Sequence, residues 1–327
     1  METESHYINP VLNLQHRKSD QFLMPEKNDD FTDSVNKYQI YPSHAIGNDK
    51  IFRDYTTLAQ WIALQKTVVI DGYAGVFWDN LKAGLAKYFT DHNLKVNWID
   101  TTQFLKPAQA IEKIVQPFLG SDDSVWGTKT TLSLIDFFDS EKLNSYKSGD
   151  TYDLNIVFGF GAALFNREAA IIYIDLPKNE LQFRMRAGSI TNLGNDCAEQ
   201  PFQMYKRFYF VDWVVLNQHK KALLNKIDIV ADGQWLDTIH WMFKNDLTAG
   251  LNAISQSVFR VRPWFEPGVW GGQWIKHNID QLNKEVPNYA WSFEMIVPEN
   301  GLVFESSGNL LEVSFDFLMF HNAEQVL

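Results

Sequence analysis

Several features are scarce in this sequence of 327 residues, and each scarcity excludes a class of protein. Cys197 is the single cysteine, so no intramolecular disulfide can form and a reducing compartment suits the chain. No uninterrupted stretch of about 18 apolar residues occurs, which predicts that the chain has no membrane span. The opening METESHYINPVLNLQHRKSD lacks a basic segment followed by an apolar run, so we expect no secretory signal. The sequence therefore predicts a cytoplasmic protein.

Positive charge is also in short supply. Acidic residues outnumber basic residues 40 to 29, and the formal net charge is −11. This balance disfavours a nucleic acid or an anionic membrane as the main partner, so any anionic ligand must be met by a local basic cluster. Hydrophobic residues make up 45% and aromatic residues 14% of the chain, which is enough material for a packed core.

Composition and the spacing of apolar residues divide the chain into three parts. Residues 1–38 are polar and predict an N-terminal arm. Residues 39–258 alternate short apolar runs with helical spacing, which predicts an α/β domain with a doubly wound parallel sheet. Residues 259–327 carry short alternating runs broken by Pro-Glu-Asn-Gly and Ser-Ser-Gly-Asn turns, which predict antiparallel β-structure. The predicted helices of the middle part include residues 78–89, 107–120, 178–187, 202–224 and 237–256.

One strand-to-helix junction, TVVIDGYAGVFWDNL at residues 67–81, has the layout that holds a phosphate in many nucleotide-binding proteins. Gly72 and Gly75 have the spacing of a tight turn at the carboxyl end of a buried strand, where such sheets bind ligands. A phosphate loop also needs a lysine for the terminal phosphates and a hydroxyl for magnesium. The corresponding Gly-Lys-Ser/Thr positions are Phe-Trp-Asp at residues 77–79. Two interpretations follow, a weak anion site at the helix N-terminus or a purely structural turn.

Residues 66–232 resemble the uridine kinase and phosphoribulokinase branch of the P-loop fold in the order of their strands and helices. In that family a strand such as IYIDLPKNELQFRMRAGS leads to an arginine-rich lid that grips the transferred phosphate. The matching positions are Arg184 and Arg186, and Lys206 and Arg207 complete the expected basic cluster. The alternative is that these arginines lie on a solvated helix face. The resemblance implies a degenerate P-loop kinase fold, and the missing lysine and hydroxyl argue against an active kinase.

The stretch RPWFEPGVWGGQWIKHNI, followed by YAWSFEMIVPENGLV, resembles the opening of class I mannose-6-phosphate isomerases. Those enzymes begin with Pro-x-Phe, a Trp-Gly-Gly turn, a short helix, a Glu-x-Trp-Glu-like strand and an Asn-Gly turn. The matching residues are Pro263, Phe265, Trp270, Gly271, Gly272, Trp291, Glu294, Asn300 and Gly301. We interpret the glycines as turn residues, whereas Glu294 either faces a sugar pocket or lies on the solvent side of its strand.

The isomerase resemblance implies that residues 259–327 begin a cupin barrel and that the kinase-like part is the N-terminal extension of a bacterial form. The implied reaction interconverts mannose 6-phosphate and fructose 6-phosphate at a zinc ion. None of the eight histidines lies in a ligand cluster, so the sequence assigns no catalytic or metal-binding residue and places the zinc site beyond Leu327.

Two functions therefore stay open. The first is the front part of a sugar-phosphate isomerase of this type. The alternative is a catalytically inactive module of kinase-like fold that binds a nucleotide or a sugar phosphate and regulates another activity. Both readings expect a small-molecule ligand. The open strand edge of a partial barrel at residues 289–315 also predicts self-association into a homo-oligomer.

Overall fold

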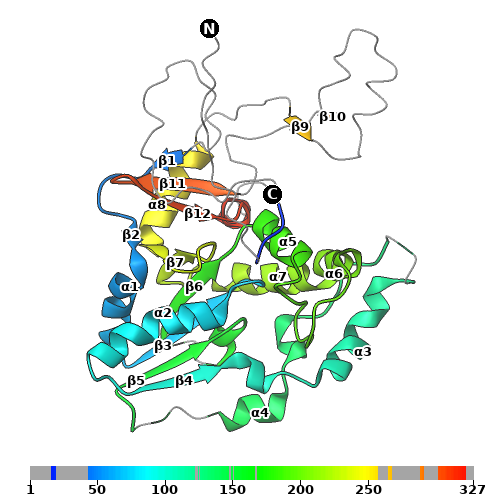
Figure 1. The fold of residues 1–327 in the computed structure, drawn as a ribbon, viewed down its shortest axis with the longest axis horizontal. Helices are drawn as coiled ribbons and strands as arrows, with labels where there is room; N and C mark the ends of the chain where they lie inside the picture. Colours follow the sequence, from blue (N-terminus) through cyan, green and yellow to red (C-terminus); the bar gives the residue numbers. More distant parts are fainter. Residues whose placement is uncertain are drawn as a thin grey trace.

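The chain forms a mixed α/β fold around a seven-stranded, largely parallel sheet (Figure 1). The computed structural model describes residues 16–19, 43–256 without 122, 123, 125, 147, 148, 150, 166 and 167, and then 264–266, 288–290 and 301–321. The strands of the sheet are β2 (Phe52–Arg53), β3 (Thr67–Gly72), β4 (Val96–Asp100), β5 (Leu154–Phe158), β6 (Ala170–Asp175), β7 (Ile229–Asp232) and β8 (His240–Phe243). Their spatial order is β2-β8-β7-β6-β3-β5-β4, and the five strands from β7 to β4 are parallel.

Helices cover both faces of the sheet. The helices are α1 (Asp54–Ala63), α2 (Trp78–Asp91), α3 (Ala108–Leu119), α4 (Ser140–Ser145), α5 (Lys178–Arg186), α6 (Pro201–Arg207), α7 (Trp213–Leu223), α8 (Lys244–Ser255) and α10 (Asp316–His321). Shorter turns are the 3-10 helices η1 (Thr101–Phe104), η2 (Leu134–Phe137) and η3 (Ala162–Leu164), and the π-helix η4 (Phe208–Asp212). Val68 and Ile70 of β3 pack in the core with α1 and α2, whereas Val69 packs in the core with α8. This alternation on one central strand confirms that the sheet is buried on both faces.

The position of β3 in the sheet indicates where a ligand is expected to bind. β5 and β6 lie on either side of β3. The strands that follow β3 in the chain are therefore added on one side of it as β5 and β4, and on the other side as β6 and β7. Open α/β sheets bind ligands beyond the carboxyl ends of the strands at such a reversal. The turn from β3 to α2, which contains Gly72 and Gly75, lies at that point, as the sequence predicts.

A C-terminal hairpin packs on the sheet. Its strands are β11 (Leu302–Ser306) and β12 (Asn309–Val313), and the short strand β1 (Ser43–Ala45) pairs in parallel with β11. Ser307 and Gly308, both with positive φ, form the two-residue turn that the Ser-Ser-Gly-Asn sequence predicts. Apolar side chains of both hairpin strands share one core with β3, β6 and α8, so the hairpin is integral to the α/β body (Figure 1).

Three local predictions need correction. The predicted helix 237–256 begins at Lys244, because residues 240–243 form β8, where side chains alternate between the two faces of the sheet. The predicted helix 202–224 is interrupted by the π-helix η4. Part of the expected C-terminal β-structure is the helix α10, although β9 (Trp264–Glu266) and β10 (Asn288–Ala290) do form an antiparallel pair.

Candidate functional site

Three neighbouring strands end in buried aspartates at the edge where ligands bind in this architecture. Asp71 lies in β3, Asp175 in β6 and Asp232 in β7, and none of the three side chains is exposed. A buried carboxylate is stable only when it is hydrogen-bonded, paired with a cation or protonated. The partners of each aspartate therefore decide whether this edge has groups to offer a ligand.

Asp71 joins the glycine turn to the segment after β5. Its Oδ1 accepts hydrogen bonds from the backbone N–H of Gly72 at 2.7 Å and of Gly161 at 3.0 Å, and its Oδ2 accepts from Ala163 N–H at 2.8 Å. His219 Nε2 lies 2.8 Å from Oδ2. These partners occupy both carboxylate oxygens, so the role of Asp71 in this arrangement is structural.

Both carboxylate oxygens of Asp175 are bound by residues from α7 and from the C-terminal segment. The fully buried Lys220 has its Nζ 2.7 Å from Asp175 Oδ1 and 2.5 Å from Ser314 Oγ. Ser314 N–H donates to Asp175 Oδ2 at 2.6 Å. The Lys220 ammonium also lies 4.0 Å from the ring centre of Phe317, in a cation–π contact.

Asp232 and Glu312 of β12 form a buried acidic group, a pair of carboxyl groups joined by the side-chain amide of Gln234. The Gln234 amide nitrogen lies 3.0 Å from Asp232 Oδ2 and 3.0 Å from Glu312 Oε2, and Glu312 N–H donates to Asp232 Oδ2 at 3.0 Å. Burial raises the pKa of Asp232 from 3.8 to about 7. Burial, reinforced by the charge of Asp232, raises the pKa of the Glu312 carboxyl well above its usual range. Among the described residues, Glu312 Oε1 has no hydrogen-bond partner.

The side chain of Arg184 is hydrogen-bonded to the glycine turn between β3 and α2. Its fully buried guanidinium donates from Nη1 to the carbonyl of Gly75 at 2.7 Å, and from Nη2 to the carbonyls of Gly233 at 3.1 Å and Gln234 at 2.8 Å. It also stacks on Phe77, with Cζ 4.3 Å from the ring centre. The arginine that the sequence predicts as a phosphate ligand therefore binds one carbonyl group of the glycine turn and two carbonyl groups of the loop after β7.

Close packing at Gly72 leaves little room above this turn. A Cβ atom on Gly72 would lie 2.8 Å from the Trp78 indole and 2.7 Å from the Ile174 carbonyl. Gly75 has a φ of +82°, a conformation that favours glycine. The indole of Trp78, at the position that would carry the lysine of a phosphate loop, thus packs against the turn.

A short N-terminal segment adds a further layer over the turn. Arg17 Nε lies 2.9 Å from Glu180 Oε2, and Glu180 Oε1 lies 3.2 Å from Arg184 Nε. The ring of His16 lies edge-on to Phe77, with their centres 5.5 Å apart. Burial, together with the charge of Arg184, lowers the pKa of His16. A buried Arg–Glu–Arg triad therefore joins residues far apart in the sequence at this site.

The remaining predicted basic residues lie elsewhere. Arg186 is exposed at the end of α5, and Lys206 Nζ donates to the carbonyl of Ser121 at 2.8 Å. Arg207 faces the loop before α6. Of the four predicted basic residues, the structure brings Arg184 alone to the glycine turn. Most of the residues that carry the isomerase resemblance, among them Trp270, Gly271, Gly272, Trp291 and Glu294, lie outside the described part of the chain.

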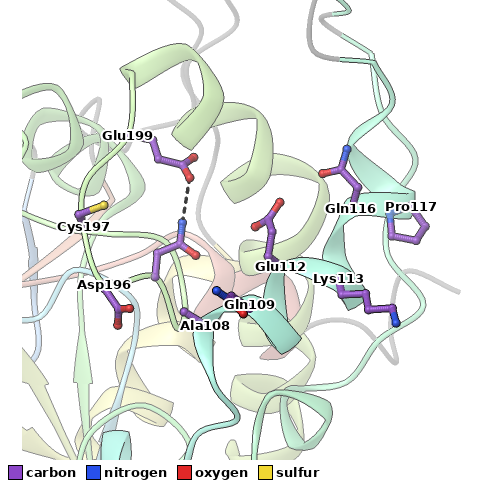
Figure 2. A pocket seen from close by; sticks show the side chains of 10 residues that line it. Ala108, Gln109, Glu112, Lys113, Gln116, Pro117, Asp196, Cys197 and Glu199 are labelled. Carbon is purple, nitrogen blue, oxygen red and sulfur yellow. Dashed lines mark hydrogen bonds between the residues drawn. The ribbon is translucent and has the colours of Figure 1, made fainter.

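A pocket of about 830 Å³ opens between α3 and the loop at residues 195–199 (Figure 2). Its size falls in the range of small-molecule sites, roughly 300–1,000 Å³. The lining side chains come from α3 and from that loop: Ala108, Gln109, Glu112, Lys113, Gln116, Pro117, Asn195, Asp196, Cys197 and Glu199.

Arg207 organises the wall of this pocket. Its side chain is 2% exposed, and its Nη1 donates to Glu112 Oε2 at 3.1 Å and to Asn195 Oδ1 at 2.6 Å. Its Nη2 donates to the carbonyl of Leu193 at 2.6 Å. Asn195 in turn donates to Glu199 Oε1 at 3.3 Å, the dashed contact in Figure 2.

Sequence reasoning missed the pocket. The spacing of Gln109, Glu112, Lys113 and Gln116 marks one polar face of α3, which is the signal of any solvated helix face. The loop at 195–199 carries no motif. Only the fold brings these two polar segments together.

The described residues contain no group of three or more His, Cys, Asp or Glu side chains arranged to hold a metal ion. No helix in that described part is long and apolar enough to cross a membrane.

The comparisons with known proteins identify a family. Residues 54–256, more than half of the chain, match a family described as a domain of unknown function (DUF8485), and the chain belongs to it. No curated protein matches.

Two solved structures show a distant likeness. One is described as a candidate fructose transport system kinase from Silicibacter sp. TM1040, with 14% identity and a TM-score of 0.30 over 40% of this chain and 79% of that one. The other is described as a possible uridine kinase from Bacillus stearothermophilus, with 10% identity and a TM-score of 0.31 over 54% of this chain and 96% of that one. Likeness at this level carries no argument about function.

Proposed function

We propose that this chain is a catalytically inactive, small-molecule-binding module with a kinase-like fold. The observation that carries the proposal is the position of Arg184, whose guanidinium donates to the carbonyl of Gly75 inside the glycine turn. The proposal keeps the layout of strand, glycine turn and helix from the kinase resemblance, and it assigns the turn a structural role.

Phosphoryl transfer needs backbone N–H groups that wrap the phosphates, a lysine, and a hydroxyl that ligates magnesium. Here Phe77 and Trp78 occupy the glycine and lysine positions, and Asp79 replaces the hydroxyl. Arg184 donates to three backbone carbonyls around the turn and pairs with Glu180. An incoming phosphate would have to displace these bonds and the stacked ring of Phe77.

The pocket between α3 and residues 195–199 is the site that we assign to the ligand. It is open, its surface is mostly apolar with amide, carboxylate and ammonium groups among its lining side chains, and Arg207 fixes its wall from beneath. The isomerase alternative rests on residues 263–301, most of which lie outside the described part of the chain, and no comparison supports it.

The first test measures phosphoryl transfer from Mg-ATP to uridine, fructose, mannose 6-phosphate and fructose 6-phosphate. We expect no transfer to any acceptor. A thermal-shift screen of polar small molecules then seeks the ligand, since a ligand at 100 times its Kd stabilises the folded chain by about 2.7 kcal/mol. Transfer that exceeds a reaction without protein would overturn the proposal.

Two matched variants locate the ligand. Gln109→Ala removes a side chain that lines the pocket, and Gln60→Ala removes an exposed glutamine of α1 outside it. We expect the ligand-induced shift to fall in Gln109→Ala and to stay unchanged in Gln60→Ala. A ligand whose shift is equal in both variants would contradict the assignment of this pocket.

A further inference from the structure

Residues 16–19 of the N-terminal arm lie against the C-terminal end of α5, where Figure 1 shows them as a short dark blue stretch. The backbone N–H of Lys18 donates to the carbonyl of Phe183 at 3.0 Å, and the Ser189 hydroxyl donates to the carbonyl of His16 at 2.6 Å. Both bonds reach the main chain of the segment, which is neither helix nor strand. The segment is therefore held as a bound peptide is held, by main-chain bonds that do not depend on its side chains.

Arg17 is the side chain that anchors this segment. It is 6% exposed, its Nε lies 2.9 Å from Glu180 Oε2, and its Cζ lies 4.9 Å from the ring centre of Phe183. A charged hydrogen bond to a carboxylate and contact with an aromatic face are the two interactions that a planar guanidinium group makes best. The side chain of the next residue, Lys18, is exposed. The surface of α5 thus recognises one position of the segment and leaves its neighbour to the solvent.

The body of the protein keeps its own contacts when this segment leaves. Glu180 Oε1 lies 3.2 Å from Arg184 Nε within α5, so the acid retains an ion pair without Arg17. Burial lowers the pKa of Arg184, and the nearby charge of Arg17 acts in the same direction. The two guanidinium groups that share one glutamate therefore repel each other, which opposes docking of the arm. Departure of Arg17 removes that repulsion and exposes Glu180 Oε2 to water, so no unpaired buried charge is left behind.

The segment also covers the place where this architecture binds ligands. The ring of His16 lies edge-on to Phe77, the residue that precedes α2 at the end of the glycine turn. That turn lies at the carboxyl end of β3, beside the change of strand order in the sheet. The family match over residues 54–256 includes the surface under the segment and excludes the segment itself. The occupant thus comes from outside the domain that carries the surface.

We propose that Phe77, Glu180, Phe183 and Ser189 form a peptide-binding site that recognises an arginine, and that residues 16–19 occupy it reversibly as a tethered ligand of the same chain. This role goes beyond the proposed function and is separate from the pocket between α3 and residues 195–199. The docked arm covers the glycine turn, and its release opens that edge of the sheet. A free peptide has to compete with the tethered segment, whose local concentration is far higher.

Fluorescence anisotropy with a labelled peptide tests the site in the full chain. The peptide is VLNLQHRKSDQ, the sequence of residues 11–21, and the receptor is the Arg17→Ala variant, which lacks the anchor and keeps the surface. We expect the peptide to bind this variant, and to bind the natural chain about tenfold more weakly or less. An Arg17→Ala peptide should bind at least about tenfold more weakly than the natural peptide, and a Lys18→Ala peptide should bind as well as it does. Absence of binding to the Arg17→Ala chain, or equal binding of the two altered peptides, would overturn the proposal.

Trypsin gives a second readout that needs no added peptide. Cleavage after Arg17 requires that its buried side chain leave Glu180, so mass spectrometry of the digest reports how often the segment opens. Glu180→Gln weakens the charged bond and keeps an oxygen for Arg184, and Glu141→Gln changes an exposed carboxylate of α4. We expect cleavage after Arg17 to rise about tenfold in Glu180→Gln and to stay unchanged in Glu141→Gln, with cleavage after Arg53 of β2 equal in all chains. Equal rates after Arg17 in the three chains would overturn the anchoring role of Glu180.

Light scattering distinguishes docking within one chain from exchange between two chains. We expect Arg17→Ala to leave the molar mass of the protein unchanged. A natural chain that is dimeric and that becomes monomeric in Arg17→Ala would place the segment of a second copy in the site, and would overturn occupation by the same chain.

Discussion

Replacing Glu312 with glutamine should stabilise the chain at neutral pH. Glu312 and Asp232 are buried together, and the nitrogen of Gln234 is shared between them. A glutamine at 312 keeps an oxygen for the bond from Gln234 and places its NH₂ group where Glu312 Oε1 has no partner among the described residues. The variant thus mimics the protonated acid without a proton to lose.

Asp232 gives the scale for the cost of burying a carboxyl group at this place, because burial raises its pKa from 3.8 to about 7. Because the folded-state pKa is the higher one, the protonated group contributes its full stability below about pH 4, and this contribution is lost as the pH rises to about 7. The shift of roughly three units corresponds to about 4 kcal/mol at 1.36 kcal/mol per unit. Glu312→Gln removes the second acid of this pair, whose own pKa burial and the charge of Asp232 raise well above its usual range, so we expect it to add about 1–4 kcal/mol at pH 7.5 and to flatten the pH dependence.

Urea unfolding followed by tryptophan fluorescence measures this effect at pH 5 and pH 7.5. Glu305→Gln on β11 is the control, since its partly exposed carboxylate accepts a local bond from Gly308 N–H and lies outside the buried acidic group. We expect Glu312→Gln to gain most at the higher pH and Glu305→Gln to change little. A Glu312→Gln variant that is no more stable than the natural chain at pH 7.5 would refute the reasoning.

Four further substitutions, one of them a control, test the packing of the site, each measured by urea unfolding. Arg184→Ala leaves the acid of a buried ion pair without its intrahelical partner and should cost about 3–5 kcal/mol, so an unchanged midpoint would contradict its role in the turn. Gly194→Ala and Gly188→Ala both place alanine at positive φ, but the added Cβ at 194 would lie 2.3 Å from Ile111 whereas that at 188 meets open space. We expect about 1 kcal/mol of backbone strain in both and a further 1–3 kcal/mol at 194, and equal costs would refute the clash. Asp71→Asn should cost about 2–4 kcal/mol through its lost charged hydrogen bonds, and a neutral result would show that those bonds add nothing.

The sequence predicts the fold well where the signal is local. The run TVVI, the glycine spacing and the helical period after residue 78 lie within one short stretch, so β3, its turn and α2 are where the pattern places them. The strand β8 was missed because its residues are buried on both faces of the sheet, so they show no period of two, and because the strand runs directly into the helix α8.

The candidate site is less predictable because it depends on contacts between distant segments. Arg184 reaches Gly75 across 109 positions of the sequence, and Arg207 reaches Glu112 across 95. The sequence alone predicts that both arginines belong to a basic cluster available to an anionic ligand. Only the tertiary fold shows that one holds the glycine turn and the other the wall of the pocket.

The hairpin β11–β12 sets how short a fragment of this chain can be and still fold. The family match ends at residue 256, yet Asp175, Asp232 and Lys220 all take partners from residues 312–314. A fragment limited to the shared stretch would bury two carboxylates and an ammonium group without those partners, and would expose the apolar surface that the hairpin covers. The smallest piece that folds alone is therefore longer than the piece that the family has in common.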